Sequence, residues 1–158
     1  MKPLKPANLR ALIQTTLKPL NLYSPAAEEL LMATCAQESL LGQYRHQQNG
    51  PAIGIFQMEP EDFSDIWRNY LAYHENLADS VGALASTQPP RPIEMQANDV
   101  FSIAMCRVHY LRAPGELPDA TDLAGIWDYY KAHYNTAGGA ATQDEFYRNY
   151  KLTGGSAK

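Results

Sequence analysis

Hydrophobic residues recur along most of the chain at spacings of three and four, the periodicity of one face of an α-helix. This pattern predicts helices over residues 7–20, 25–41, 60–71, 96–111 and 123–130, with a shorter helix near 77–84. The stretch 96–111 is the most densely apolar and is expected to be the buried centre of the fold. With a closing helix after residue 142, the pattern predicts a mainly α-helical protein of about seven helices.

Helix boundary signals support several of these elements. Ser24 followed by Pro25 has the form of an N-cap and first helical residue, and Gly42 is placed to end that helix. Thr142 and Glu145 have the spacing of a capping box and predict the start of the last helix.

The segments between the helices are rich in glycine and proline. Residues 43–58 are polar, then glycine-bearing, then briefly β-like, which predicts at most a small β-hairpin near residues 44–58. Residues 86–92 contain three prolines and are expected to form a loop. The glycine-rich end of the chain, 153–158, is predicted to be a flexible tail.

Composition bounds the class of protein. A length of 158 residues fits one domain, 1–158, and 45% hydrophobic with 19% charged residues is ordinary for a folded chain. The formal net charge is −4 and no basic patch runs along the sequence, so nucleic acid is not expected as a partner. No apolar run is long enough to span a bilayer, and the basic N-terminus lacks the apolar region of a signal peptide.

Cysteine and histidine give no sign of a metal or cofactor. Cys35 and Cys106 fall on apolar helix faces, which predicts buried free thiols, with a disulfide left open. The four histidines show no ligand spacing, so neither a metal site nor a cofactor is expected.

Glu38 is the first candidate for chemistry, because it lies near the end of the strongly apolar helix 25–41. A carboxyl group beside a core loses water, which raises its pKa and lets it hold and donate a proton at neutral pH. The alternative is that Glu38 ends an amphipathic helix and points to solvent.

The loop after this helix favours the first interpretation. Gly50, Pro51 and Gly54 permit a tight fold across the helix end, and Gln57 is the one amide in the apolar run 53–58. A lone glutamine there either satisfies a buried partner or faces a polar ligand. Trp67 and Tyr70 suit a sugar cleft or, more simply, core packing.

Three short motifs resemble a known superfamily. Glu38-Ser39 at a helix end, then Ala52-x-Gly-Ile-Phe-Gln-x-x-Pro60, then Tyr134-Asn135 are similar to the lytic transglycosylase and goose-type lysozyme group, especially its small phage-encoded members. Two departures are Pro51, where the pattern usually has glycine, and Thr136, where alanine is commoner.

The resemblance implies a lysozyme-like fold that cleaves peptidoglycan glycan strands. It implies that Glu38 is the catalytic acid and base and that Tyr134 lies beside it. The implied substrate-binding residues are Ser39, Gly54, Ile55, Phe56, Gln57 and Asn135. In this reaction the 6-hydroxyl of the sugar attacks, so that 1,6-anhydro-N-acetylmuramic acid ends form. The resemblance also suggests other phage virion proteins as partners, and a location in the virion or host cytoplasm before delivery to the periplasmic cell wall.

Two other functions stay open. A hydrolase on the same scaffold needs a second carboxylate, for which Glu59, Glu61 and Asp62 are the nearest in sequence. Their position at a helix start predicts instead that they face backbone N–H groups, away from a cleft. A phage structural or glycan-binding domain without turnover is the third possibility, and an ordinary turn after a helix also explains residues 134–139.

Overall fold

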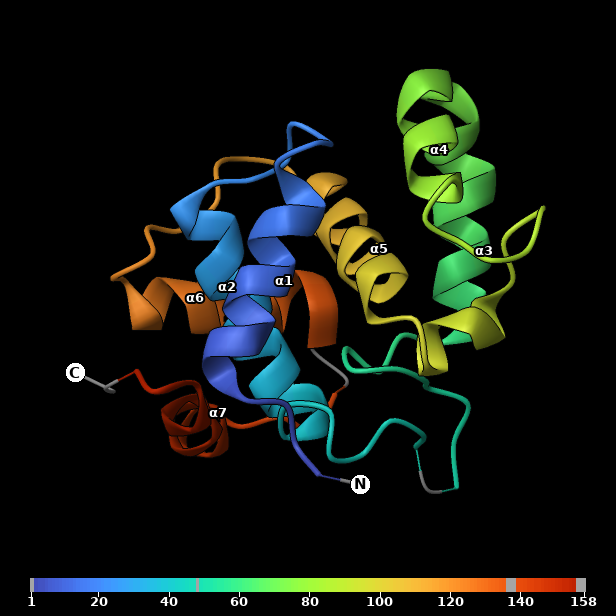
Figure 1. Cartoon of the computed structure of the whole chain (residues 1–158). Helices are drawn as coiled ribbons and strands as arrows, with labels where there is room; N and C mark the ends of the chain where they lie inside the picture. The colour runs from blue at the N-terminus through green and yellow to red at the C-terminus, as the bar shows by residue number, and fades with distance from the viewer. Residues whose placement is uncertain (1, 48, 136–138, 156–158) are drawn as a thin grey trace.

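The computed structural model describes residues 2–47, 49–135 and 139–155, and Figure 1 shows its arrangement of helices. Within these residues there are seven α-helices and no β-strand, so the prediction of about seven helices is confirmed. The α-helices are α1 (Pro6–Leu17), α2 (Pro25–Ser39), α3 (Pro60–Asn69), α4 (Glu75–Gly82), α5 (Asp99–Leu111), α6 (Leu123–Tyr130) and α7 (Gln143–Tyr150). The 3₁₀ turns are Leu71–Tyr73, Pro92–Gln96 and Lys151–Thr153, and Lys131–Asn135 is a π-helical turn that continues α6.

The predicted caps of two helices are present. The Ser24 hydroxyl accepts a hydrogen bond from the Ala27 amide at 3.0 Å, and the Thr142 hydroxyl accepts one from the Glu145 amide at 3.3 Å. Each satisfies one of the free N–H groups at a helix start.

Helix α2 ends at Ser39, two residues before the predicted end. Leu40 and Leu41 have left-handed φ angles of 50° and 58°, ahead of the expected left-handed Gly42 at 84°. The Ser39 hydroxyl accepts a hydrogen bond from the Gly42 amide at 2.8 Å, which helps hold this turn. The turn directs the following loop back across the end of α2 beside Glu38.

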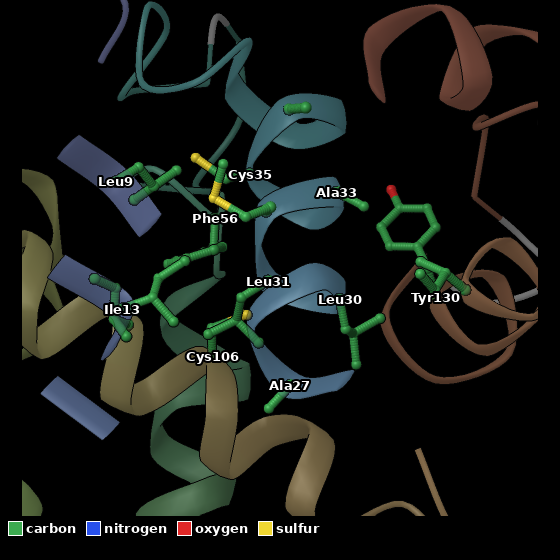
Figure 2. Close-up of a cluster of buried hydrophobic side chains, with 14 of the residues drawn as sticks. Leu9, Ile13, Ala27, Leu30, Leu31, Ala33, Cys35, Phe56, Cys106 and Tyr130 are labelled. Carbon is green, nitrogen blue, oxygen red and sulfur yellow. The ribbon is translucent and has the colours of Figure 1, made fainter. Parts of the chain in front are cut away.

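The core consists of two clusters of buried side chains. The larger one surrounds α2, and its members come from α1, α2, α5, α6, α7 and the loop residues Ile55 and Phe56 (Figure 2). The smaller one joins α3, α4 and α5. Helix α5 contributes to both, but α2 is as completely buried, so the expectation of a single central helix at 96–111 is corrected to a shared centre.

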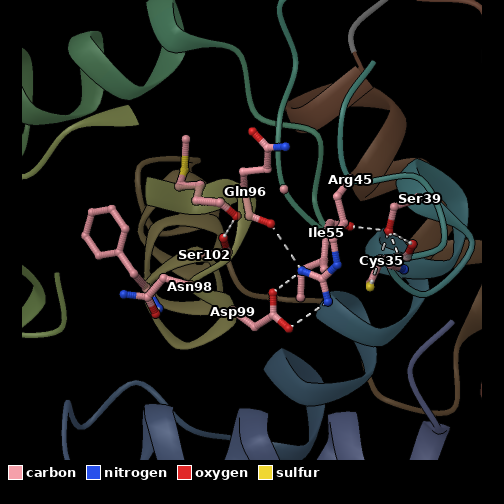
Figure 3. Close-up of polar contacts among 12 residues, drawn as sticks. Cys35, Ser39, Arg45, Ile55, Gln96, Asn98, Asp99 and Ser102 are labelled. Atoms are coloured by element: carbon pink, nitrogen blue, oxygen red, sulfur yellow. Dashed lines mark hydrogen bonds and ion pairs between the residues drawn. The ribbon is translucent and has the colours of Figure 1, made fainter. Parts of the chain in front are cut away.

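The segment between α2 and α3 is an anchored loop with two isolated antiparallel bridges, His46–Ile53 and Ile53–Met58. Arg45 forms an ion pair with Asp99 of α5, with distances of 2.5 and 2.9 Å, and the Ser39 hydroxyl donates to the Ile55 carbonyl at 2.6 Å (Figure 3). Gly54 has a φ of 83°, and a Cβ there would lie 2.5 Å from the Met95 carbonyl oxygen. Only glycine fits this position.

The remaining expectations fall into three groups. Thr153 is buried and its hydroxyl donates to the Tyr150 carbonyl at 2.7 Å, and a flexible tail over 153–158 stays a prediction. Residues 156–158 and Thr136 lie outside the described residues. The predicted loop 86–92 ends one residue earlier, because Pro92 starts a 3₁₀ turn. Cys35 and Cys106 are buried free thiols. In the described ranges, no helix has the length and apolarity needed to cross a membrane.

Candidate functional site

A cavity of about 590 Å³ opens where the end of α2, the 43–59 loop, the start of α3, helix α5 and the π-helical turn meet. This volume is typical of sites for small ligands or parts of a polymer. Its lining is mostly polar and consists of Glu38, Gln47, Ala52, Gln57, Met58, Glu59, Asp62, His109, Tyr134, Asn135 and Gly139. The cavity therefore combines carboxylates, amides and one imidazole around Glu38.

Glu38 is only partly exposed, and its Oε2 accepts a hydrogen bond from the Tyr130 hydroxyl of α6. Burial raises the pKa of Glu38 to about 7, the Tyr130 hydrogen bond acts in the opposite direction, and the negative charge of Glu145 raises it further. The desolvation effect is the largest because one donor cannot replace the water that a carboxylate loses. A carboxyl group with this pKa exchanges a proton at neutral pH, as a general acid and base must.

Tyr130 was not identified from the sequence. It is fully buried, and its ring packs near Trp127 and Phe146, with ring centroids 6.1 and 5.0 Å away. Tyr130 lies on the apolar face of α6, as any tyrosine of a hydrophobic core does. The periodicity of the sequence therefore does not indicate that its hydroxyl bonds Glu38. Its partner Glu38 lies 92 residues earlier in the chain.

Tyr134 lines the cavity as expected, but its hydroxyl donates to the Phe56 carbonyl at 2.6 Å and not to Glu38. Its ring lies between those of Tyr110 and Tyr130, with centroid distances of 5.3 and 6.0 Å. Tyr134 thus joins the π-helical turn to the 43–59 loop and fixes two walls of the cavity against each other.

Among the predicted substrate-binding residues, Gln57 and Asn135 line the cavity. The Gln57 amide nitrogen donates to the Gly54 carbonyl at 2.9 Å, which leaves its Oε1 as the atom available to a ligand. The other four are buried and are absent from the cavity lining; they are Ser39, Gly54, Ile55 and Phe56. Their contacts shape the loop, so a direct role in binding sugar stays a prediction without a contact to support it.

The acids at the start of α3 are placed differently from the prediction. Glu59 is the N-cap residue but makes no side-chain capping hydrogen bond, and both Glu59 and Asp62 line the same cavity as Glu38. The helix-start argument failed for Glu59 because good N-cap residues have short side chains, such as serine, threonine, aspartate and asparagine, and glutamate is not among them. Glu61 lies on a separate surface beside Ser64 and Arg68.

His109 of α5 is a second residue that the sequence did not single out. Its Nε2 donates to the His133 carbonyl at 3.0 Å, and its Nδ1 accepts from Arg112 at 3.3 Å, because the carbonyl can only accept and the guanidinium can only donate. Burial lowers the pKa of His109. With both ring nitrogens occupied, the neutral imidazole supports the π-helical turn that carries Tyr134.

Over the part of the chain that is described, no group of three or more histidine, cysteine, aspartate or glutamate side chains is arranged to hold a metal ion. Comparison with protein-family models, with curated proteins and with solved structures found no match for the chain.

Proposed function

We propose that the protein is a peptidoglycan lytic transglycosylase that cleaves the β-1,4 bond between N-acetylmuramic acid and N-acetylglucosamine, with Glu38 as general acid and then general base. The observation that carries the proposal is Glu38 itself: a carboxyl group with a pKa of about 7 on the wall of a polar cavity. This is the property that protonation of a glycosidic oxygen requires. The substrate and a lysozyme-like fold are inferred from the motif resemblance, which lies at Glu38-Ser39, residues 52–60 and Tyr134-Asn135.

The polar lining is consistent with a sugar substrate. Gln57 offers a carbonyl oxygen and Gln47 also lines the cavity, so that hydroxyl and N-acetyl groups find hydrogen-bond partners there. Protonation of the leaving oxygen by Glu38 develops an oxocarbenium-like centre. The carboxylate that remains then takes the proton of the 6-hydroxyl as this oxygen closes the 1,6-anhydro ring, so one group performs both transfers.

One observation favours a second candidate, a lysozyme-type muramidase. Glu59 and Asp62 share the cavity with Glu38, so a second carboxylate is available to activate water or stabilise the cation. The third possibility, a domain without turnover, explains neither the raised pKa of Glu38 nor its placement at a cavity.

Digestion of purified peptidoglycan in ¹⁸O-labelled water separates these functions. The transglycosylase leaves unlabelled 1,6-anhydro ends that are one water lighter than reducing ends, whereas a muramidase leaves reducing ends that carry the label. Labelled reducing ends would overturn the proposal in favour of hydrolysis, and Glu59→Gln and Asp62→Asn would then identify the second carboxylate. No released muropeptide, with the Glu38→Gln variant as the matched blank, would support the non-catalytic domain.

A further inference from the structure

A line of contacts runs behind the cavity, from the surface of α3 to the π-helical turn. Arg112, which follows α5, uses two nitrogens of its guanidinium: Nη1 donates to Asp65 Oδ2 at 2.7 Å and Nη2 donates to His109 Nδ1 at 3.3 Å. His109 Nε2 in turn donates to the His133 carbonyl at 3.0 Å. Helices α3 and α5 and the π-helical turn are therefore joined through one imidazole, which also lines the cavity. None of these four residues belongs to the three motifs of the resemblance.

Asp65 holds the guanidinium in place. Its second oxygen, Oδ1, accepts a hydrogen bond from Asn69 Nδ2 at 2.5 Å, so both oxygens of the carboxylate are engaged. A guanidinium is planar and does not lose its proton in proteins, so Arg112 presents an N–H group to His109 at every pH. His109 Nδ1 has to stay without a proton for as long as this contact lasts.

We propose that Arg112, held by Asp65, is a positioning residue that keeps the His109 ring uncharged and so holds the π-helical turn in place as a wall of the cavity. If His109 takes up a proton, both of its ring nitrogens carry hydrogen, and Nδ1 then faces a guanidinium nitrogen 3.3 Å away. Two cations that can only donate repel each other, so the contact breaks and the ring is free to turn away from the His133 carbonyl. In the proposed reaction, on which this step rests and which it deepens, acid therefore loosens the wall that carries Tyr134.

Groups from every element around the ring act on the same titration. Burial is the largest cause and lowers the pKa of His109, and the Arg112 charge acts in the same direction. The hydrogen bond to His133 and the charges of Asp62 and Asp65 act in the opposite direction. The other groups that pack on the ring or share its cavity are Tyr110, Tyr134, Glu38 and Glu59. All of them are the same in the variants of Arg112 below, so a difference between variants reports the Arg112 contact.

The direct test follows the ring nitrogens of His109 by NMR in ¹⁵N-labelled protein over a pH titration, with the signals assigned by their loss in His109→Gln. In the wild type the ring is expected to carry its hydrogen on Nε2 and to take up a second proton only below the ordinary histidine pKa of 6.5. Arg112→Met removes both the donor and the charge at Nδ1 and is expected to raise the midpoint by roughly one pH unit.

Two matched variants separate this contact from charge in general. Arg112→Lys keeps a cation that can only donate and is expected to restore the wild-type midpoint. Arg68→Met removes the same charge from the surface of α3 beside Glu61 and is expected to leave the midpoint unchanged. If Arg112→Met does not fold, Arg112→Gln, which is also uncharged, takes its place. A wild-type midpoint in the folded Arg112→Met or Arg112→Gln protein, or an equal shift in Arg68→Met, would overturn the proposal.

The pH profile of cleavage tests the effect on the cavity. Glu38 has to hold its proton to begin the proposed reaction, so its ionisation gives the alkaline limb of the profile and His109 gives the acid limb. The acid limb is expected to move up with the midpoint in Arg112→Met and to disappear in His109→Gln, whose amide can bond both partners but does not titrate. An acid limb that stays in place in both variants would overturn the role of His109 at the wall. The ring titration needs no substrate, so if the ¹⁸O digestion overturned the proposed function, the titration would still decide whether Arg112 keeps His109 uncharged.

Discussion

Helix α2 carries three glutamates, and two of them, Glu28 and Glu38, are opposite in character. Glu28, near its start, is 8% exposed and accepts hydrogen bonds from Arg10, Gln14 and Tyr23 at 2.9, 2.7 and 2.8 Å. Burial acts to raise the pKa of Glu28, but the three donors and the Arg10 charge together hold it below its usual value. Glu38, near the end of the same helix, has one donor and a pKa of about 7.

The difference shows that burial alone does not raise the pKa of a carboxyl group to near neutrality. Both groups lose water, and what separates them is how many donors replace it. At Glu28, hydrogen-bond donors from α1 and Tyr23 replace the lost hydration of the carboxylate and connect α1 to α2. At Glu38, beside the cavity, a single donor replaces it. Four predictions test this contrast, from the largest expected effect to the smallest.

Replacing Glu38 by glutamine should abolish most of the proposed activity. Glutamine keeps the shape and an acceptor oxygen but cannot transfer a proton, so the rate should fall by at least 10²–10⁴-fold, the usual contribution of general acid–base catalysis. The measurement is the release of soluble muropeptides from purified peptidoglycan. Near wild-type release by this variant would move the catalytic role to another carboxylate of the cavity.

The same substitution should make the protein more stable at alkaline pH. Because the folded pKa of Glu38 is raised from 4.5 to about 7, the native state binds the proton more tightly than the unfolded chain, and stability falls as the pH rises through this window. The loss amounts to roughly 3 kcal/mol by pH 8. Urea unfolding between pH 4 and 8 should show this decline in the wild type and not in Glu38→Gln. Parallel curves for the two proteins would mean that Glu38 titrates normally.

Glu28→Gln should show the reverse pattern. Removing the charge leaves Arg10 and its neighbours with a weaker partner, at a cost of about 2–3 kcal/mol of unfolding free energy. Since the folded pKa of Glu28 is lowered, its contribution is present above pH 4.5 and is lost as the pH falls below that value. Cleavage assayed well below the melting temperature should be unchanged. A large loss of activity in a folded Glu28→Gln protein would contradict the separation of the two ends of α2.

Tyr134→Phe should have the smallest effect. It removes the hydrogen bond to the Phe56 carbonyl, worth about 1 kcal/mol, and loosens two walls of the cavity. We expect a modest loss of activity with no change in the pH dependence, because Tyr134 does not hydrogen-bond Glu38. A shifted pH profile in Tyr134→Phe, with none in Tyr130→Phe, would reverse the assignment of the two tyrosines.

The sequence by itself determined the local features of this protein. The helices, the caps at Ser24 and Thr142, the buried cysteines and the unusual position of Glu38 follow from residue spacing and from interactions within a few positions of the chain. Gly54 and the polar Gln57 in an apolar run also stand out in the sequence.

Only the tertiary structure decided which groups meet. Tyr130 reaches Glu38 across 92 residues, Tyr134 reaches Phe56 instead, and Glu59 and Asp62 face the cavity although their place at a helix start suggested otherwise. Such pairings depend on how α6, the π-helical turn and the 43–59 loop pack against α2, and the pKa of a carboxyl depends on the donors that this packing supplies. Periodicity identifies a buried face, but it does not identify the side chain on the other side of it.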